Sequence, residues 1–237
     1  MSNALNDPMG QAIIDFANTG IDQEIIVSSD LCDDDVISSA YLHRSYNDMP
    51  KIEQLALEQC RGKILDVGAG AGSHAQHLME NGASVLCIDT SPLSVSYMKQ
   101  ENIHAECINF FNFDPTEKFD TLLMLMNGIG IAGKLSNLEY TLIKANRLLS
   151  TGGKLICDST DVSYIYEDDE GGMWVDLNTE YYGNFNFQMS YKKHTSEWFN
   201  WLYVDFNKLE EIGEKAGFSV TKLFENDNHY LAELMKK

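Results

Sequence analysis

The sequence predicts an α/β protein with a doubly wound, mostly parallel sheet of seven strands that ends in an antiparallel strand pair. Two observations predict this class. From Lys63 onward, short apolar runs alternate with amphipathic segments, which is typical of parallel strands joined by right-handed helical crossovers. Near the C-terminus, two apolar runs are separated only by the turn-forming Asp227-Asn228. Strands joined so tightly must be antiparallel.

Residues 1 to about 60 precede this alternation, and we interpret them as a helical N-terminal cap. Apolar residues recur at helical spacing between Asp33 and Tyr46. Pro50 suits the first position of a further helix, because its missing N–H would have no partner there. The start of the chain lacks the basic and apolar regions of a secretory signal, so no leader is expected. The predicted division is a cap over 1–60 and an α/β segment over 61–237 with an insertion at 161–205, all within one structural domain.

Five parallel strands are expected after the cap, each a short apolar run. They span residues 63–68, 84–89, 104–109, 119–127 and 154–159. The helices between them span residues 73–82, 91–102 and 136–150. In the last of these helices, Ser136 and Glu139 have the spacing of a capping box. Gly152-Gly153 is expected to end that helix.

The last third of the chain breaks the alternation of strands and helices. Residues 184–191 alternate strictly between apolar and polar side chains, and a second apolar run follows a polar turn. This pattern predicts an inserted β-hairpin near residues 181–205. Its many aromatic residues leave three interpretations open: core packing, a lid over an apolar substrate, or a contact in a homodimer. A helix over 206–217 and strands over 219–226 and 229–235 complete the expected fold.

The net charge and the cysteine content restrict the binding partners and the cellular location that the sequence predicts for this protein. Acidic residues outnumber basic ones 36 to 17, which gives a formal net charge of −19. Such a surface repels phosphate backbones and anionic lipids, so neither nucleic acid nor a membrane is an expected partner. The five cysteines are scattered and form no CxxC pair. We interpret them as buried, reduced thiols in a cytoplasmic protein.

The strongest chemical signal is a glycine-rich turn at the end of the first predicted strand. Asp66 is followed by Gly68 and Gly70 in the sequence DVGAGAG. Glycines allow a sharp turn and a close approach of a ligand to the main chain, and the next helix presents its N-terminus there. Twenty-three residues after Asp66, the second strand ends in Asp89, where a carboxylate suits the two hydroxyls of a ribose. These residues predict a ligand that contains a nucleoside.

The spacing of the glycines distinguishes two ligands that contain a nucleoside, NAD(P) and an adenosine that carries an amino acid. The dinucleotide fingerprint G-x-G-x-x-G would need a glycine at position 73, which is Ser73. Asp66 would also add negative charge beside a pyrophosphate, whereas it suits a ligand with a positively charged amino group. The turn therefore favours an adenosine that carries an amino acid over NAD(P).

The segments LDVGAGAG, CIDTS and FDTLLMLMNGIG together resemble the class I S-adenosylmethionine-dependent methyltransferases, over residues 60–160. The resemblance implies a Rossmann-like fold, with S-adenosylmethionine as cofactor and S-adenosylhomocysteine as its product. It also implies that the methionine portion is held by Asp66 and the backbone of Gly68, Ala69 and Gly70. Asp89 would hold the ribose hydroxyls.

The same resemblance implies further cofactor contacts. Those beside the adenine are Thr90, Ser91, Asn109 and Phe110. Relatives often carry an acid where this chain has Asn109, so Asn112 and Asp114 remain alternatives. Those on the methionine side, near the entrance for the acceptor, are Met126 and Asn127. From the segment before the first strand, the candidates are Arg44 and Tyr46.

The predicted function is transfer of a methyl group, by in-line displacement, to an O, N or C atom of a small molecule. The segment NGIGIAG after the fourth strand carries no charge, which suits an uncharged or aromatic acceptor. Because a sulfonium methyl is already activated, the reaction demands no particular base and no catalytic residue is named. Asp158 remains a candidate for substrate binding, for a base or for a structural cap, and His194 is a candidate base.

Other functions stay open from the sequence. One is an NAD(P)-dependent oxidoreductase, a second is a non-catalytic protein that binds S-adenosylmethionine, and a third is a protein methyltransferase whose acidic surface attracts basic tails. No metal is expected, because His74 and His77 lack a third ligand at useful spacing.

Overall fold

The computed structural model of the protein describes residues 6–166 and 180–237. Its main sheet has seven strands in the order β11-β12-β7-β6-β3-β4-β5. The strands are β3 (Lys63–Val67), β4 (Ser84–Asp89), β5 (Ala105–Cys107), β6 (Phe119–Met124), β7 (Leu149–Thr160), β11 (Phe218–Asn226) and β12 (His229–Lys236). Strands β7 to β5 pair in parallel, and β12 pairs antiparallel with both β7 and β11. The predicted fold class is therefore confirmed.

Helices cover both faces of the main sheet. They are α2 (Lys51–Gln59), α3 (Ser73–Glu80), α4 (Pro92–Gln100), α5 (Leu138–Leu148) and α6 (Phe206–Lys215). One buried cluster joins Leu142 of α5 and Leu209 of α6 to Leu122 of β6. A second cluster holds residues of α2, α3 and α4 together with Leu123 of the same strand. Because successive side chains of a strand face opposite sides, the continuous apolar run of β6 supplies both cores.

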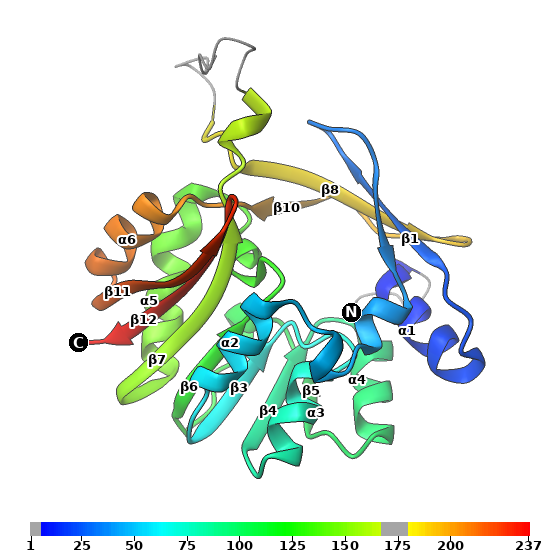
Figure 1. Ribbon diagram of the computed structural model, residues 1–237, viewed down its shortest axis with the longest axis horizontal. Helices are drawn as coiled ribbons and strands as arrows, with labels where there is room; N and C mark the ends of the chain where they lie inside the picture. Colours follow the sequence, from blue (N-terminus) through cyan, green and yellow to red (C-terminus); the bar gives the residue numbers. More distant parts are fainter. Residues whose placement is uncertain (1–5, 167–179) are drawn as a thin grey trace.

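A second sheet arches over the carboxyl ends of the main strands (Figure 1). Its strands are β1 (Glu24–Ser29), β2 (Asp35–Ser38), β8 (Asn184–Tyr191), β9 (His194–Thr195) and β10 (Phe199–Leu202), in the order β10-β8-β1-β2 with β9 paired to β8. The predicted hairpin is present, since β8 and β10 pair antiparallel with Phe187 opposite Phe199. The other edge of β8 pairs with β1, where Val27 lies opposite Met189. The N-terminal segment and the hairpin thus build one sheet.

The prediction of a wholly helical cap is wrong at Glu24–Ser29, which forms β1, and between Asp33 and Tyr46, where the chain forms β2 and two 3-10 turns. Helix α1 (Pro8–Thr19) does form, and Gly10 lets it lie close to α4, because a side chain there would collide with Ser91. The β-branched run of β1 finds partners in β2 and β8. Pairing between distant segments overrides the helical spacing of the local sequence. Pro50 precedes α2 as its N-cap rather than as its first residue.

Two local predictions for α5 are also wrong. Its N-cap is Asn137, without a capping side-chain hydrogen bond, so Ser136 and Glu139 form no capping box. Gly152 and Gly153 lie inside β7 instead of ending the helix, because β7 begins at Leu149, directly after α5, and pairs there with β6. The 3-10 turns are η2 (Ala40–His43), η3 (Tyr46–Asp48), η4 (Phe110–Asn112), η5 (Gly128–Ala132), η6 (Leu135–Asn137) and η7 (Ser163–Tyr166).

The cysteines are all unpaired. Cys87 and Cys157 are buried as predicted, but Cys32 and Cys107 are exposed, so the prediction of buried thiols is wrong for these two. Within residues 6–166 and 180–237, no helix is long and apolar enough to cross a membrane. The cytoplasmic location, the homodimer and the boundaries of cap and insertion stay predictions, and residues 167–179 of the insertion lie outside the described residues.

Candidate active site

A cavity of about 910 Å³ lies between the carboxyl ends of β3, β4 and β6 and the underside of the second sheet. Of the residues predicted to contact the cofactor, all but Tyr46 line it. They are Arg44, Asp66, Gly68, Ala69, Gly70, Asp89, Thr90, Ser91, Asn109, Phe110, Met126 and Asn127. Carboxyl ends of parallel strands share one edge of a sheet, which explains why residues separated along the chain meet here.

Asp66 is the most unusual charged residue of the cavity. Its side chain is only 2% exposed, and its Oδ2 atom has no hydrogen-bond partner among the described residues. Burial raises the pKa of Asp66 to about 6, with His74 lowering it and Asp89 raising it further. A buried carboxylate oxygen without a partner is costly. It is the group that a ligand ammonium would satisfy.

The glycine turn approaches the cavity with its main chain. Gly68 and Gly70 have φ angles of +73° and +57°, and a Cβ built on either would meet no atom within 4 Å. The N–H groups of Gly68 and Ala69 donate to the carbonyl oxygen of Ile88, and that of Gly70 donates to Asp89 Oδ2 at 2.9 Å. These three donors are already used within the protein. The turn therefore offers a ligand open space and carbonyl oxygens, which suits a cation better than an anion.

Asp89 ends β4 beside this turn. Its Oδ2 accepts from Gly70 N, and its Oδ1 accepts from Ser91 N at 2.8 Å. Burial raises the pKa of Asp89, and these backbone hydrogen bonds oppose the rise. Each carboxylate oxygen retains a second lone pair, so the side chain is held in place and still able to accept from a pair of hydroxyls.

Of the residues predicted to lie beside the adenine, only some line the cavity. Asn109 and Phe110 line the cavity, whereas the alternatives Asn112 and Asp114 do not. The Asn109 Oδ1 atom caps η4 by accepting from Phe111 N at 2.9 Å. Its amide nitrogen is thereby oriented by the cap.

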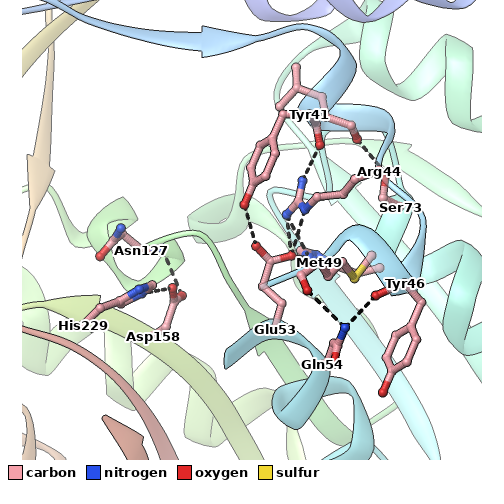
Figure 2. Close-up of polar contacts among 12 residues, drawn as sticks. Tyr41, Arg44, Tyr46, Met49, Glu53, Gln54, Ser73, Asn127, Asp158 and His229 are labelled. Atoms are coloured by element: carbon pink, nitrogen blue, oxygen red, sulfur yellow. Dashed lines mark hydrogen bonds and ion pairs between the residues drawn. The ribbon is translucent and has the colours of Figure 1, made fainter. Parts of the chain in front are cut away.

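Arg44 is buried, and the carboxylate that it binds belongs to the protein. Its Nε and one terminal nitrogen donate to Glu53 Oε2 (Figure 2). His74 Nε2 also contacts Glu53 Oε2, at 2.8 Å. The other terminal nitrogen of Arg44 donates to Tyr41 O at 2.7 Å. Most of the donors of Arg44 are thus used within the protein, although Arg44 does line the cavity, and its contact with the cofactor stays a prediction.

Tyr46 and the two histidines of α3, His74 and His77, do not come together at one site. Tyr46 does not line the cavity, and its ring stacks on His77 at a centroid distance of 3.9 Å. His74 instead binds Glu53. The two histidines therefore occupy different environments and do not converge on one point. Sequence reasoning missed Glu53, because nothing in its local pattern separates it from an ordinary helical surface glutamate.

Met126 and Asn127 form a strained turn after β6. Their φ angles are +62° and +55°, and each non-glycine residue in this left-handed region costs about 1–2 kcal/mol. Asp158 Oδ1 accepts from Asn127 N at 3.0 Å, and Thr160 donates to Asn127 Oδ1 at 2.9 Å. Asp158 itself is buried and does not line the cavity. Of its three predicted roles, only the structural one has contacts here.

The second sheet closes the cavity with aromatic rings. Phe185, Phe187 and Met189 face it, as the alternation of β8 predicted, and Phe199, Trp201 and Tyr203 join them. Leu202 and Val204 of the same run instead enter the core. The contribution of β1 and β2 to the cavity was not predicted from the sequence. Their cavity residues, and those of the loop between them, are Val27, Ser29, Cys32, Asp33, Asp35 and Ile37.

This geometry fits an adenosine that carries an amino acid, and known proteins support it. Residues 64–153 match the sequence profile of a methyltransferase domain. A methyltransferase from Bacteroides fragilis, crystallised with S-adenosyl-L-homocysteine, is 39% identical over 99% of this chain and 97% of that chain, with a TM-score of 0.92. This chain belongs to the S-adenosylmethionine-dependent methyltransferases. Its cofactor is S-adenosylmethionine, and the NAD(P)-dependent alternative is set aside.

Other relatives of this methyltransferase share less with it. Demethylmenaquinone methyltransferase of Tropheryma whipplei (strain Twist) is 31% identical over 99 residues, which span only 40% of this chain and 40% of that relative. KedS8, a sugar N-methyltransferase from Streptoalloteichus sp. ATCC 53650, covers 78% of this chain and 85% of its own at 15% identity, with a TM-score of 0.55. This second likeness concerns the fold alone.

Asp66→Asn is expected to stabilise the free methyltransferase near neutral pH. The pKa of Asp66 is about 6 in the folded protein, against an ordinary value of 3.8, so the folded protein holds this proton more tightly than the unfolded chain. Stability is therefore lost as pH rises between these values, and the full cost, on the order of 3 kcal/mol, is present above about pH 6. Thermal unfolding should show a larger gain in Tm for the variant at about pH 7.5 than at about pH 4.

The same variant should bind S-adenosylhomocysteine at least about tenfold more weakly at neutral pH, equivalent to roughly 1.4 kcal/mol. In the wild type, affinity should rise with pH up to about 6, because the ligand ammonium prefers the ionised carboxylate. Isothermal titration calorimetry at several pH values measures both effects. Equal affinities for the two proteins would contradict the role of Asp66.

Gly70→Ala is expected to remove most cofactor binding while the protein stays folded. The added methyl would project into the open space of the cavity at a left-handed φ. Gly82→Ala is a matched control, because Gly82 also has a positive φ of +83° and open space but lies outside the cavity. Both variants should lose about 1–2 kcal/mol of stability from backbone strain. Only Gly70→Ala should lose affinity for S-adenosylhomocysteine in calorimetry; an equal loss in both would refute the cradle.

Proposed function

We propose that this methyltransferase transfers a methyl group to a small-molecule acceptor inside the cavity. The observation that carries the proposal is the construction of the cavity from two unlike halves. One half holds the glycine turn, Asp66 and Asp89, and the other is roofed by the aromatic residues of β8 and β10. A volume of about 910 Å³ is within the range of pockets that bury a small ligand.

The polar half would hold the cofactor through residues of this chain. Asp66 would accept from the ammonium, the turn at Gly68 and Gly70 would let the ligand approach the main chain, and Asp89 would accept from the ribose hydroxyls. Asn109 and Phe110 would flank the adenine. When bound, S-adenosylmethionine supplies a methyl group activated by its sulfonium, which an acceptor lone pair takes as the C–S bond breaks. The chain's contribution is to align the two reactants and to exclude water.

The aromatic half favours an uncharged or aromatic acceptor. Phe185, Phe187 and Tyr203 contact one another at centroid distances of 5.1 to 6.2 Å, so the roof is a continuous apolar surface. Burial, followed by the negative groups of Cys32 and Asp35, raises the pKa of Tyr203 to about 12. The phenol therefore stays protonated and neutral at physiological pH. Acceptor atoms of O, N or C type are all compatible with this surface.

The proposal is tested with methyl-labelled S-adenosylmethionine and a cell extract divided into small-molecule and macromolecular fractions. Label should move into the small-molecule fraction only, and chromatography with mass spectrometry then identifies the acceptor atom. Transfer into proteins would favour the protein methyltransferase. Tight binding of S-adenosylhomocysteine without transfer to either fraction would favour the non-catalytic binding protein.

Trp201→Ala is expected to raise the KM for the acceptor by about tenfold or more, since a large ring of the roof is lost. The affinity for S-adenosylhomocysteine should change by less than about threefold, a small fraction of the binding free energy. Trp198→Ala is the matched control, because Trp198 is 47% exposed and does not line the cavity. Steady-state kinetics with the identified acceptor distinguish them. Similar KM values for both variants would contradict an acceptor site under the roof.

A further inference from the structure

The turn at Met126 and Asn127 depends on contacts from outside its own strand. Both residues have left-handed backbone angles although neither is glycine, and both line the cavity. Such a conformation persists only where the surroundings hold it. The contacts that hold it therefore decide the position of this part of the cavity wall.

Asp158 and His229, which lie in neighbouring strands, make the contacts that hold this turn in place. Asp158 lies in β7 and is 1% exposed; its Oδ1 accepts from Asn127 N at 3.0 Å. Its Oδ2 lies 2.6 Å from Nε2 of His229, at the start of β12 (Figure 2). Because an ionised carboxylate only accepts hydrogen bonds, His229 Nε2 is the donor. A chain of hydrogen bonds thus runs from β12 through β7 to the turn after β6.

We propose that Asp158 and His229 are positioning residues for methyl transfer, an inference that rests on the proposed function of the cavity. Neither residue lines the cavity, so neither contacts the reactants there. His229 fixes the carboxylate of Asp158, and the carboxylate fixes the left-handed turn. Through the turn, the pair sets where Met126 and Asn127 stand between the cofactor and the acceptor. Small displacements at such a junction lower the rate, because transfer depends on alignment.

The same two strands carry a matched control pair. Lys154 of β7 and Glu233 of β12 form an ion pair at 2.7 Å with both side chains largely buried. This pair lies toward the other end of the strands and does not line the cavity. If cross-strand polar contacts between β7 and β12 serve stability alone, substitutions in the two pairs will behave alike.

The first experiment observes the turn directly and needs no acceptor. The ten methionines are labelled with ¹³C at the methyl group, and the Met126 resonance is assigned with Met126→Leu. In His229→Ala this resonance should move by more than its linewidth, while that of the fully buried Met98 stays in place. Glu233→Gln should leave Met126 unchanged. His229→Gln, whose side-chain amide replaces the donor, should restore the wild-type position.

The second experiment measures kinetics with the acceptor identified as described above. His229→Ala should lower kcat about tenfold with KM for the acceptor and the Kd of S-adenosylhomocysteine within about threefold of wild type. His229→Gln and Asp158→Asn, which both keep hydrogen bonds in this chain, should recover most of kcat. Glu233→Gln should not change it.

Two outcomes would overturn the inference: an unmoved Met126 resonance in His229→Ala, or equal losses of kcat in His229→Ala and Glu233→Gln. If His229→Ala does not fold, Asp158→Asn and His229→Leu decide by the same resonance, with Asp158→Asn expected to keep it and His229→Leu to move it. If no acceptor is found, the proposed function fails, but the resonance still decides whether the pair positions the turn.

Discussion

Parallel pairing is the constraint on which the whole site depends. Strands β6, β3 and β4 run in the same direction, so their carboxyl ends, and the turns that follow, meet at one edge. Asp66, Asp89 and Met126 come from three such ends and line one cavity. No single segment of the chain holds this site together. It exists because crossover helices return each strand to the same starting edge of the sheet.

The burial of the Asp66 carboxylate in the cavity wall is electrostatically unfavourable, and a bound cation would offset this cost. Asp66 is almost fully buried, and one of its oxygens lacks a partner among the described residues. The N–H groups of the glycine turn, which would stabilise an anion, are used within the protein. A cationic amino group is thus the complementary partner. Under the proposed role of Asp66, the lower stability of the free protein would be offset when the methyl donor binds.

The second sheet gives the cavity its other half. Strand β8 joins β10, its partner in the hairpin, to β1 from the beginning of the chain. One face of this sheet presents Phe185 and Phe187 to the cavity. Core packing and a roof over the cavity, two of the three interpretations of the aromatic hairpin, are therefore not exclusive, since Leu202 packs in the core while its neighbours Trp201 and Tyr203 line the cavity. The homodimer contact stays a prediction.

The sequence by itself determined the main sheet and the cofactor half of the site. Apolar runs and helical spacing are local signals, and the spacing from Asp66 to Asp89 follows from one strand–helix–strand unit. Tertiary structure alone decided the roof and the internal pairing of charged groups. The segment from Asp33 to Tyr46 has helical spacing, yet part of it forms β2 and pairs with β1. This pairing outweighs the local preference for a helix. Glu53 meets Arg44 and His74 only because separate elements pack together, and no local pattern encodes that meeting.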